Sequence, residues 1–375
     1  MTMLNQPDFA DEILALFAER GAQPVDIPVI QPADAFLDMA GEDLRRRIFL
    51  TESETGESLC LRPEFTIPVC LHHIETTPAD TRRYAYLGQV FRQRRDGANE
   101  FYQAGIEDLG TADTAAADAA AMKDAGDTLA RLLPGSDLQT TLGDQTVFEA
   151  VVAALGLPNG WQTRLVRAFG DRDMLDALLA DLSQPSKDGP GVDPEAQDLL
   201  SNGDEAGLAT LIDTRMQATG YLTNSSRTPL EIAKRLIQKA RLASAHLYDR
   251  ALAVLKSFLA LDTPLDDASE ALASFAGGAG LDIAPALSVF DSRVAALRNC
   301  GFEAGSTRYR AAFGRPLDYY SGLVFETSAD GAVLAGGGRY DRLLTLLGAR
   351  TAIPAVGFSL WLDRIAVART GGANG

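Results

Sequence analysis

The sequence is poor in the residues that build covalent cross-links and metal sites. Its 375 residues include three cysteines and three histidines. These are Cys60, Cys70, Cys300, His72, His73 and His246. The cysteines are too few and too scattered for a disulfide framework or a Cys-x-x-Cys motif, and the histidines lack metal-ligand spacing. We therefore expect no metal site, and buried thiols kept reduced in the cytoplasm.

Basic residues are also scarce relative to acidic ones. Lysine and arginine number 34 against 51 aspartates and glutamates, a formal net charge of -17. A field of this sign repels phosphate backbones unless basic residues gather locally, so general nucleic-acid binding is disfavoured. Residues 1–12 carry no basic region followed by an apolar run, and no apolar stretch approaches membrane-spanning length. We expect a protein that is neither secreted nor membrane-spanning.

The first third of the chain alternates between helix and strand patterns. Apolar residues at helical spacing over Phe9–Phe17 predict a first helix that stops at Gly21. Strand patterns follow, and they predict a β-hairpin and then two adjacent antiparallel strands. The predicted strands cover residues 25–29, 48–51, 59–62, 84–92 and 101–109.

The middle of the chain is helical. An alanine-rich helix is predicted from Thr111 to about Leu133, and helical periodicity dominates residues 147–299. Thr228-Pro229-Leu230-Glu231 supplies an N-cap, a first-turn proline and a capping-box glutamate, so a helix is predicted to begin there. Loops are predicted at Ser183–Pro194 and Ala276–Gly280.

Strands return after Gly305, and two helices follow. The predicted strands are 307–313, 317–327 and 332–335, with a tight turn at Asp330-Gly331, and the helices are 340–347 and 359–367. This order predicts an α+β fold, an antiparallel sheet flanked by helices. We expect residues 1–145 and 301–375 to form that domain, and residues 146–300 to form a mainly helical insertion.

Polar residues share one face of the predicted strand 101–109. Side chains alternate along a strand, so Gln103, Gly105 and Glu107 lie on one side, with the outer two roughly 13 Å apart. A small ligand lying across Gly105 would meet an amide and a carboxylate. A solvated face is the alternative, and these residues alone favour it. Glu64 is either a ligand carboxylate or a helix-start charge, and the helix dipole favours the second.

Three further segments are candidate ligand sites. Arg92, Arg94 and Arg95 crowd one hairpin, which fits a local anion site or solvated arginines equally well. Residues 315–320, Arg-Pro-Leu-Asp-Tyr-Tyr, fit a small-ligand site or an ordinary aromatic pair. Residues 336–341 open a predicted helix whose N–H groups suit an anion, but they lack the P-loop and Rossmann spacings. No cofactor is therefore expected, and no Ser/His/Asp or Cys/His set is found.

Taken in order, these segments resemble the catalytic domain of class II aminoacyl-tRNA synthetases, specifically histidyl-tRNA synthetase. The matching segments are residues 25–36 (the dimer-forming motif 1), 61–66 (Leu-Arg-Pro-Glu-Phe-Thr), 86–110 (motif 2), 315–320 and 337–341 (two histidine-specific segments) and 355–364 (motif 3). The resemblance implies a class II synthetase-like fold, a homodimer and a site for L-histidine. It places Glu64, Thr66, Gln103, Glu107, Arg315, Tyr319 and Tyr320 in that site.

The departures from the synthetase pattern fall mainly on the nucleotide half of the site. Arg94 stands where the synthetase has a glutamate that takes part in ATP binding. Trp361 replaces a glycine that leaves space for adenosine, and Asp363 replaces a glutamate. In the amino-acid pocket, Phe65 and Pro316 replace glycines. Arg92 and Arg364 remain, and the resemblance implies a residual anion or phosphate site there. We expect ATP to fit poorly and no residue to be catalytic.

Only 11 residues follow Arg364 in the sequence, so we expect no C-terminal anticodon-binding domain of the kind that a histidyl-tRNA synthetase carries. This truncation and the eroded nucleotide site resemble the regulatory subunits of short-form ATP phosphoribosyltransferase. That resemblance implies a non-catalytic partner of a separate catalytic chain in a hetero-oligomer, serving histidine feedback without tRNA or membrane. Two alternatives stay open, an active histidine-activating ligase and a standalone histidine-binding protein.

Overall fold

The computed structural model describes residues 6–39, 42–95, 97–183, 196, 199–200, 203–218, 228–241, 245–302, 304–315 and 319–371. The chain divides into two compact units. The first comprises residues 1–150, 169–171 and 258–375, and the second comprises residues 151–168 and 172–257. Most of the loop predicted at Ser183–Pro194, and residues 316–318 of the Arg-Pro-Leu-Asp-Tyr-Tyr segment, lie outside the described residues.

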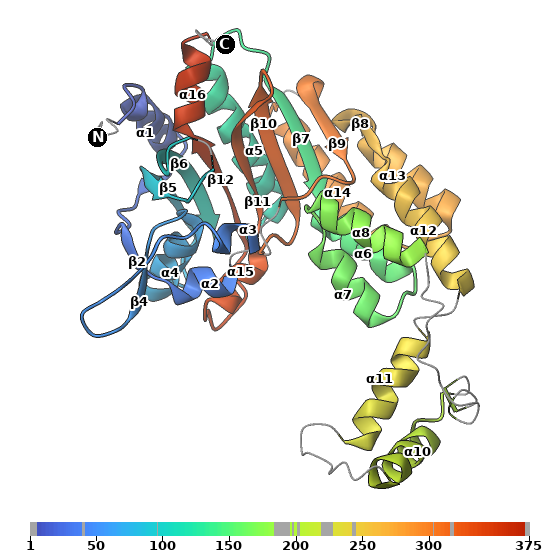
Figure 1. Cartoon of the computed structure of the whole chain (residues 1–375). Helices are drawn as coiled ribbons and strands as arrows, with labels where there is room; N and C mark the ends of the chain where they lie inside the picture. Colours follow the sequence, from blue (N-terminus) through green and yellow to red (C-terminus); the bar gives the residue numbers. More distant parts are fainter. Residues whose placement is uncertain are drawn as a thin grey trace. The chain divides into compact units, whose positions relative to one another are not determined.

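A nine-stranded sheet forms the centre of the first unit (Figure 1). Its strand order is β1 (Gln23–Pro24), β5 (Arg82–Phe91), β6 (Glu100–Leu109), β12 (Ala355–Trp361), β11 (Ala332–Arg339), β10 (Leu323–Ala329), β7 (Gln139–Asp144), β9 (Thr307–Arg310) and β8 (Asp262–Pro264). Neighbouring strands are antiparallel except for the parallel pairs β1–β5 and β7–β9. The predicted α+β class with a largely antiparallel sheet is confirmed.

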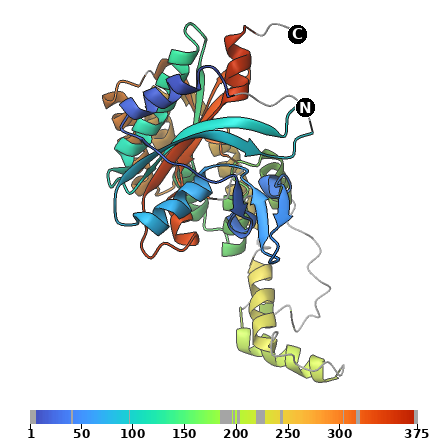
Figure 2. The same cartoon turned by 90° about the vertical axis from the view of Figure 1, so that its left-hand side faces the viewer.

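The long hairpin β5–β6 pairs over ten residues on each strand, as the sequence predicted, and it twists across the unit (Figure 2). Further along the chain, the turn between β10 and β11 falls at Asp330 and Gly331. Both residues have positive φ, 50° and 77°. Such a pair of left-handed residues matches the right-handed twist of the strands that it joins. The predicted tight turn is therefore confirmed.

A second, three-stranded sheet contains β2 (Ile30–Pro32), β4 (Ser58–Leu61) and β3 (Leu50–Glu52), which confirms the first predicted hairpin. The strand predicted over residues 25–29 is wrong, because β1 ends at Pro24 and β2 begins at Ile30. Pro28 has no N–H for a ladder. The buried guanidinium of Arg62 instead donates to the carbonyls of Ile27 and Gln89, so it takes the place of strand pairing there.

Helices cover the sheet of the first unit. They are α1 (Ala10–Glu19), α2 (Asp34–Met39), α3 (Glu42–Arg45), α4 (Thr66–Thr76), α5 (Thr114–Leu132), α13 (Leu265–Ala279), α14 (Ala284–Asn299), the 3-10 turn η1 (Ala304–Ser306), α15 (Asp341–Leu346) and α16 (Leu362–Arg369). The loop predicted at Ala276–Gly280 is wrong, because α13 continues to Ala279 and Gly280 ends it with φ 63°. The helix predicted from Ser359 begins later, since residues 359–361 belong to β12.

A buried network of ion pairs joins several elements of this unit. Arg293 of α14 donates to Asp118 of α5 at 2.7 Å and to Asp144 of β7 at 2.5 Å. Arg339 of β11 donates to the same Asp118 and, at 2.7 Å, to Asp341. Burial raises the pKa of Asp118, while the two arginines oppose that shift. Each charge therefore depends on its partners, because an unpaired buried charge is costly.

The second unit is helical in its described parts. It contains the end of α6 (Gln145–Ala154), then α7 (Asn159–Arg167), α8 (Arg172–Ser183), α10 (Glu205–Ala218), α11 (Pro229–Arg241) and most of α12 (Ala245–Leu259). The predicted capping box is confirmed, since the Thr228 N–H donates to Glu231 at 3.0 Å and the Glu231 N–H donates to Thr228 Oγ1 at 3.3 Å. Throughout the described parts of the chain, the helices are too short or too polar to cross a membrane.

Candidate functional site

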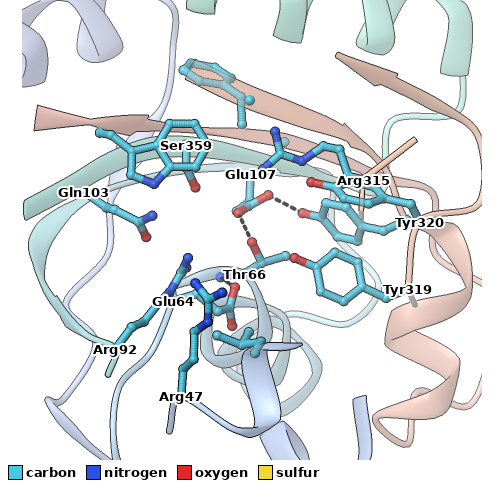
Figure 3. Close-up of a pocket in the computed structure, with 16 residues that line it drawn as sticks. Arg47, Glu64, Thr66, Arg92, Gln103, Glu107, Arg315, Tyr319, Tyr320 and Ser359 are labelled. Carbon is cyan, nitrogen blue, oxygen red and sulfur yellow. Dashed lines mark hydrogen bonds between the residues drawn. The ribbon is translucent and has the colours of Figure 1, made fainter. Parts of the chain in front are cut away.

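A cavity in the first unit lies between one face of the sheet and the segments around α3 and α4 (Figure 3). It is lined by Leu44, Arg47, Glu64, Thr66, Arg92, Gln103, Glu107, Arg315, Tyr319, Tyr320, Gly336, Tyr340, Gly357, Phe358, Ser359 and Trp361. All seven residues that the sequence placed in a histidine site are among them, and so is Arg92. Segments more than 200 residues apart in the chain thus converge on one space.

Strand β6 supplies the floor residues Gln103 and Glu107. Both are only 1% exposed, so the alternative of a solvated face is wrong. The space beside Gly105 is filled by the phenol of Tyr86, because a Cβ there would lie 2.3 Å from the Tyr86 hydroxyl. That hydroxyl shares a 2.7 Å hydrogen bond with Ser359 Oγ. Gly105 therefore admits a neighbouring side chain rather than a ligand.

Glu64 both lines the cavity and caps α4. Its carboxylate accepts the N–H groups of Thr66 at 2.7 Å and Ile67 at 2.9 Å, which are the first donors of the helix. The helix-start role that its sequence context favoured is therefore present. Burial raises the pKa of Glu64, while these two N–H groups and Arg92 oppose the shift. Glu64 is thus a rigid carboxylate held at the cavity wall.

Glu107 is held by two hydroxyl groups. Thr66 Oγ1 donates to one carboxylate oxygen at 2.8 Å, and the Tyr340 hydroxyl donates to the other. Gly357 leaves the necessary room, since a Cβ there would lie 1.7 Å from Glu107 Oε2. Burial raises the pKa of Glu107 to about 8, although both hydrogen bonds oppose the shift. At neutral pH this carboxyl is therefore mostly protonated, and a cationic ligand would favour its charged form.

One acceptor and one donor at the cavity have no partner among the residues that the structure describes. They are Gln103 Oε1 and Arg315 Nε, both buried. Arg315 is fixed by an ion pair to Glu326 at 2.9 Å. Gly336 makes this position possible, because a Cβ there would lie 1.7 Å from Arg315 Nη1. Buried polar atoms normally have partners, so these two are candidates to bind a polar ligand.

Aromatic rings form another wall of the cavity. The rings of Tyr319 and Tyr320 lie 5.0 Å apart at 51°, and Tyr319 meets Tyr340 edge-on at 5.9 Å. The paired tyrosines are therefore packed together, as an ordinary aromatic pair would be, and also line the cavity. Their ring faces and hydroxyls suit a small planar group.

Changed and retained side chains of the nucleotide half of the site contact one another. The guanidinium of Arg94 lies 3.6 Å from the centre of the Phe101 ring and pairs with Asp363 at 3.4 Å. Arg364 lies 5.1 Å from the Trp361 ring and donates to the Val333 carbonyl at 2.7 Å. Arg364 does not line the cavity, so the structure does not bring it together with Arg92 there.

The glycine run at residues 336–338 belongs to β11 and not to a helix start, because α15 begins only at Asp341. The glycine N–H groups therefore do not lie at a helix start, although the predicted helix is present and begins at Asp341. These glycines instead permit close approach: a Cβ on Gly338 would lie 2.9 Å from the Tyr320 ring. Sequence reasoning also missed Arg47 and Tyr340 as cavity residues. Within the described residues, no cluster of histidine, cysteine or acidic side chains is suited to a metal ion.

Comparison with known proteins gives a consistent result. The histidyl-tRNA synthetase family model matches residues 4–365. An ATP phosphoribosyltransferase regulatory subunit of Rhizobium rhizogenes is 64% identical over 371 residues, covering 98% of this chain and 100% of that one. The protein of the same description from Agrobacterium fabrum is 64% identical, covering 98% and 99%. That from Sinorhizobium medicae is 64% identical, covering 97% and 98%.

Solved structures of low sequence identity share the fold. A protein from Bacillus halodurans described as an ATP phosphoribosyltransferase regulatory subunit/histidyl-tRNA synthetase superposes with a TM-score of 0.62 at 19% identity, covering 100% of this chain and 84% of that one. A histidine–tRNA ligase subunit from Alicyclobacillus acidocaldarius gives a TM-score of 0.59 at 22% identity, covering 100% and 97%. Both are similar to this chain in fold, a class II synthetase-like architecture.

Proposed function

Because the chain belongs to the family of ATP phosphoribosyltransferase regulatory subunits, we propose that it assembles with a separate catalytic chain, activates it and makes it sensitive to free histidine. The hetero-oligomer would carry out the first step of histidine biosynthesis in the cytoplasm. This chain contributes no catalytic residue to that reaction. Its own role is to bind histidine and to favour one state of the complex.

The observation that carries the proposal is the cavity itself. It combines two buried carboxyl groups, a pair of tyrosines, and an acceptor on Gln103 and a donor on Arg315 that have no partner within the described part of the chain. Free histidine carries complementary groups. Its ammonium group would lie near Glu107 or Glu64 and could also donate to Gln103 Oε1, its carboxylate would lie toward Arg315 or the side-chain N–H of Gln103, and its imidazole near the tyrosines. Thr66 would keep the Glu107 carboxylate in place for this ligand.

Feedback requires more than binding. A ligand shifts an equilibrium between two states of a complex only by the difference between its affinities for those states. The cavity draws its lining from α4, β6, β11 and β12, and from the segment that follows β9. A change in the packing of these elements would therefore change the affinity for histidine. We expect the inhibited state of the complex to bind histidine more tightly than the active state.

An active synthetase is the competing reading, and the nucleotide half of the site argues against it. The Phe101 ring face carries the side chain of Arg94, whose charge is paired with Asp363. The Trp361 indole lines the cavity where the synthetase pattern has a glycine. ATP would need to displace these groups. We therefore expect no adenylate formation, and no charging of tRNA.

Isotope exchange between ATP and pyrophosphate separates the two readings. The purified chain should show no exchange on addition of histidine, while an authentic histidyl-tRNA synthetase under the same conditions shows it. Histidine-dependent exchange by this chain would establish a ligase instead. A third reading, a standalone histidine-binding protein, is tested by affinity purification from the native host, in which a catalytic phosphoribosyltransferase chain should be recovered in fixed proportion.

We also propose that the chain is a homodimer through residues 25–36. Within this region Val29 is 40% exposed and Ile30 is 57% exposed, and Leu50 on β3, at the other edge of the same three-stranded sheet, is 57% exposed. Large apolar side chains gathered on one sheet mark an interaction site more often than a solvated face. A two-fold interface would bury the same patch on both copies.

A further inference from the structure

The cavity face of β12 passes from small side chains to a large one. Gly357, Ser359 and Trp361 alternate along the strand, and all three line the cavity. In the antiparallel register, Gly357 stands opposite Glu107 and Trp361 stands opposite Gln103 on β6. Residues directly opposite one another on such a pair project from the same side of the sheet. The Glu107 end of the cavity therefore faces a glycine, whereas the Gln103 end is bounded by an indole.

Arg315 reaches the indole end of the cavity across the neighbouring strands. Its side chain lies over Gly336 of β11, whose partner in the register of β12 is Ser359. Glu326, the partner of Gly336 on β10, holds one side of the guanidinium at 2.9 Å. The guanidinium carbon lies 5.5 Å from the centre of the Trp361 ring, within the range of cation–π attraction. Arg315 is thus positioned by a carboxylate and an indole, and its buried Nε has no partner within the described part of the chain.

Both groups that would receive the carboxylate of histidine therefore flank Trp361. Gln103 stands opposite it across the β6–β12 pair, and Arg315 lies against its ring. Figure 3 shows the side chains of Gln103 and Arg315 directed into the same space. A carboxylate bound by either group lies beside the indole. Any substituent on that carboxylate would consequently meet the ring.

The indole of Trp361 is held in place by its own packing. The residue is 7% exposed and belongs to the apolar cluster that also contains Phe101 and Tyr319. The guanidinium of Arg364 lies 5.1 Å from the centre of the ring, and the carbonyl of Val333 tethers that guanidinium at 2.7 Å. Turning the ring aside would break these contacts, and a close-packed interior offers little free volume to receive it. The ring therefore acts as a fixed wall of the cavity.

We infer that Trp361 determines the specificity of this site by restricting it to amino acids with an unsubstituted carboxylate. Free histidine fits, because its carboxylate ends at Arg315 or Gln103. Amides, esters and mixed anhydrides of histidine do not fit, because the group that they add would need the space of the indole. The site thus reports free histidine and not carboxyl-activated or esterified histidine. This inference rests on the proposed function and assigns to that function the class of ligand that the chain senses.

Calorimetric titration of the full-length chain with L-histidine, L-histidinamide and L-histidine β-naphthylamide tests the inference. The two amides lack the carboxylate charge equally, so the ratio of their dissociation constants isolates the effect of size. In the wild type the naphthylamide should bind at least about tenfold more weakly than histidinamide, because its added rings must enter a filled space. Trp361→Ala should lower this ratio at least about tenfold by opening that space. Trp361→Phe, which leaves a smaller ring, should give an intermediate ratio.

The second tryptophan of the chain provides a matched control. Trp161 has a cation–π contact of its own, with Arg164 at 4.8 Å, and does not line the cavity. Trp161→Ala should leave the ratio of the two amides within about twofold of the wild type. Free histidine gives a second readout: Trp361→Ala should weaken its binding about two- to fivefold, because Arg315 loses one cation–π contact.

The possible failures of the two proposals can be told apart. Equal binding of the two amides by the wild type would overturn the inference and leave histidine binding intact. So would a ratio that neither Trp361 variant changes, or a Trp361→Ala chain that binds histidine but not the naphthylamide. If the wild type does not bind histidine at all, the proposed function fails, and this inference fails with it.

Discussion

Replacing Glu107 by Gln removes the ionisable group from the floor of the proposed histidine site and changes little else. The side chain keeps its length and its place among Thr66 and Tyr340, whose hydroxyls can turn to donate or accept. The amide resembles the protonated carboxyl, which prevails at neutral pH because the pKa of Glu107 is about 8. What the variant cannot do is ionise when a cation binds. The loss of affinity therefore measures that ionisation.

The magnitude depends on pH in a defined way. A charge-assisted hydrogen bond to the ammonium group contributes roughly 1.5–3 kcal/mol. At pH 7 the deprotonation of Glu107 costs the wild type about 1.4 kcal/mol, because the pH lies one unit below a pKa of about 8. This cost is subtracted from the free energy that the charged hydrogen bond contributes to binding. The variant should then bind up to about tenfold more weakly at pH 7. At pH 8 the cost falls to about 0.4 kcal/mol and the ratio of the two dissociation constants should widen by up to about fivefold.

Calorimetry on both proteins at pH 6, 7 and 8 provides the measurement. The ratio of the two dissociation constants is the quantity to follow, because the titration of histidine itself cancels in it. Between pH 6 and pH 8 the ratio should rise from near 1 by roughly tenfold, as the ionised fraction of Glu107 rises from about 1% to about half. A ratio that does not change with pH would refute the assignment of the ammonium group to Glu107.

Thermal melts of the unliganded proteins serve as the folding control. The folded pKa of Glu107 lies above its unfolded value of about 4.5. The unfolded chain therefore loses this proton first, and wild-type stability falls as pH rises from about 4.5 to about 8. Gln cannot contribute to this decline. The variant should melt at or above the wild-type temperature at pH 8, and a marked fall would show that the substitution damages the fold.

Three further outcomes are expected. Gly336→Ala should weaken histidine binding about tenfold with little change in melting temperature, because the new Cβ displaces only the flexible end of Arg315. In urea, Arg293→Met should lower the free energy of unfolding by about 3–5 kcal/mol by leaving buried carboxylates unpaired. The exposed Arg298→Met on the same helix should lower it by less than about 1 kcal/mol. Sedimentation should show a dimer at micromolar concentration and a monomer for Ile30→Lys, and a monomeric wild type would exclude the proposed interface.

Much of the fold could be predicted because its signals are local. A hairpin was predicted from the alternating patterns of β5 and β6 and from the polar segment between them. The antiparallel register of the two strands confirms it. The capping box at Thr228 and the tight turn at Asp330 follow from the hydrogen bonds and φ angles available to those residue types. The convergence of several predicted residues on one cavity was also foreseen, because short motifs in a fixed order carry information that single residues do not.

The errors have long-range causes. The run at residues 336–338 looks like a helix start in the sequence. In the structure its glycines leave room for atoms from segments distant in the chain, such as the guanidinium of Arg315 beside Gly336. Arg47 belongs to an arginine run with no motif of its own, and it lines the cavity only because the folded chain brings its segment beside the end of β5. Arg364 matches a motif and its role as an anion-binding residue stays a prediction; it donates to the carbonyl of Val333 and does not line the cavity. Local sequence does not encode such contacts.

The central claim, that this chain gives a catalytic partner its activity and its response to histidine, is tested most directly by reconstitution. The measurement is the rate at which the catalytic chain from the same organism joins ATP to phosphoribosyl pyrophosphate, with and without this chain, across a histidine titration. We predict that activity requires this chain, that histidine inhibits the complex, and that Glu107→Gln shifts inhibition to higher histidine concentration without loss of activation. Full activity of the catalytic chain alone, or identical inhibition with the variant, would contradict the account.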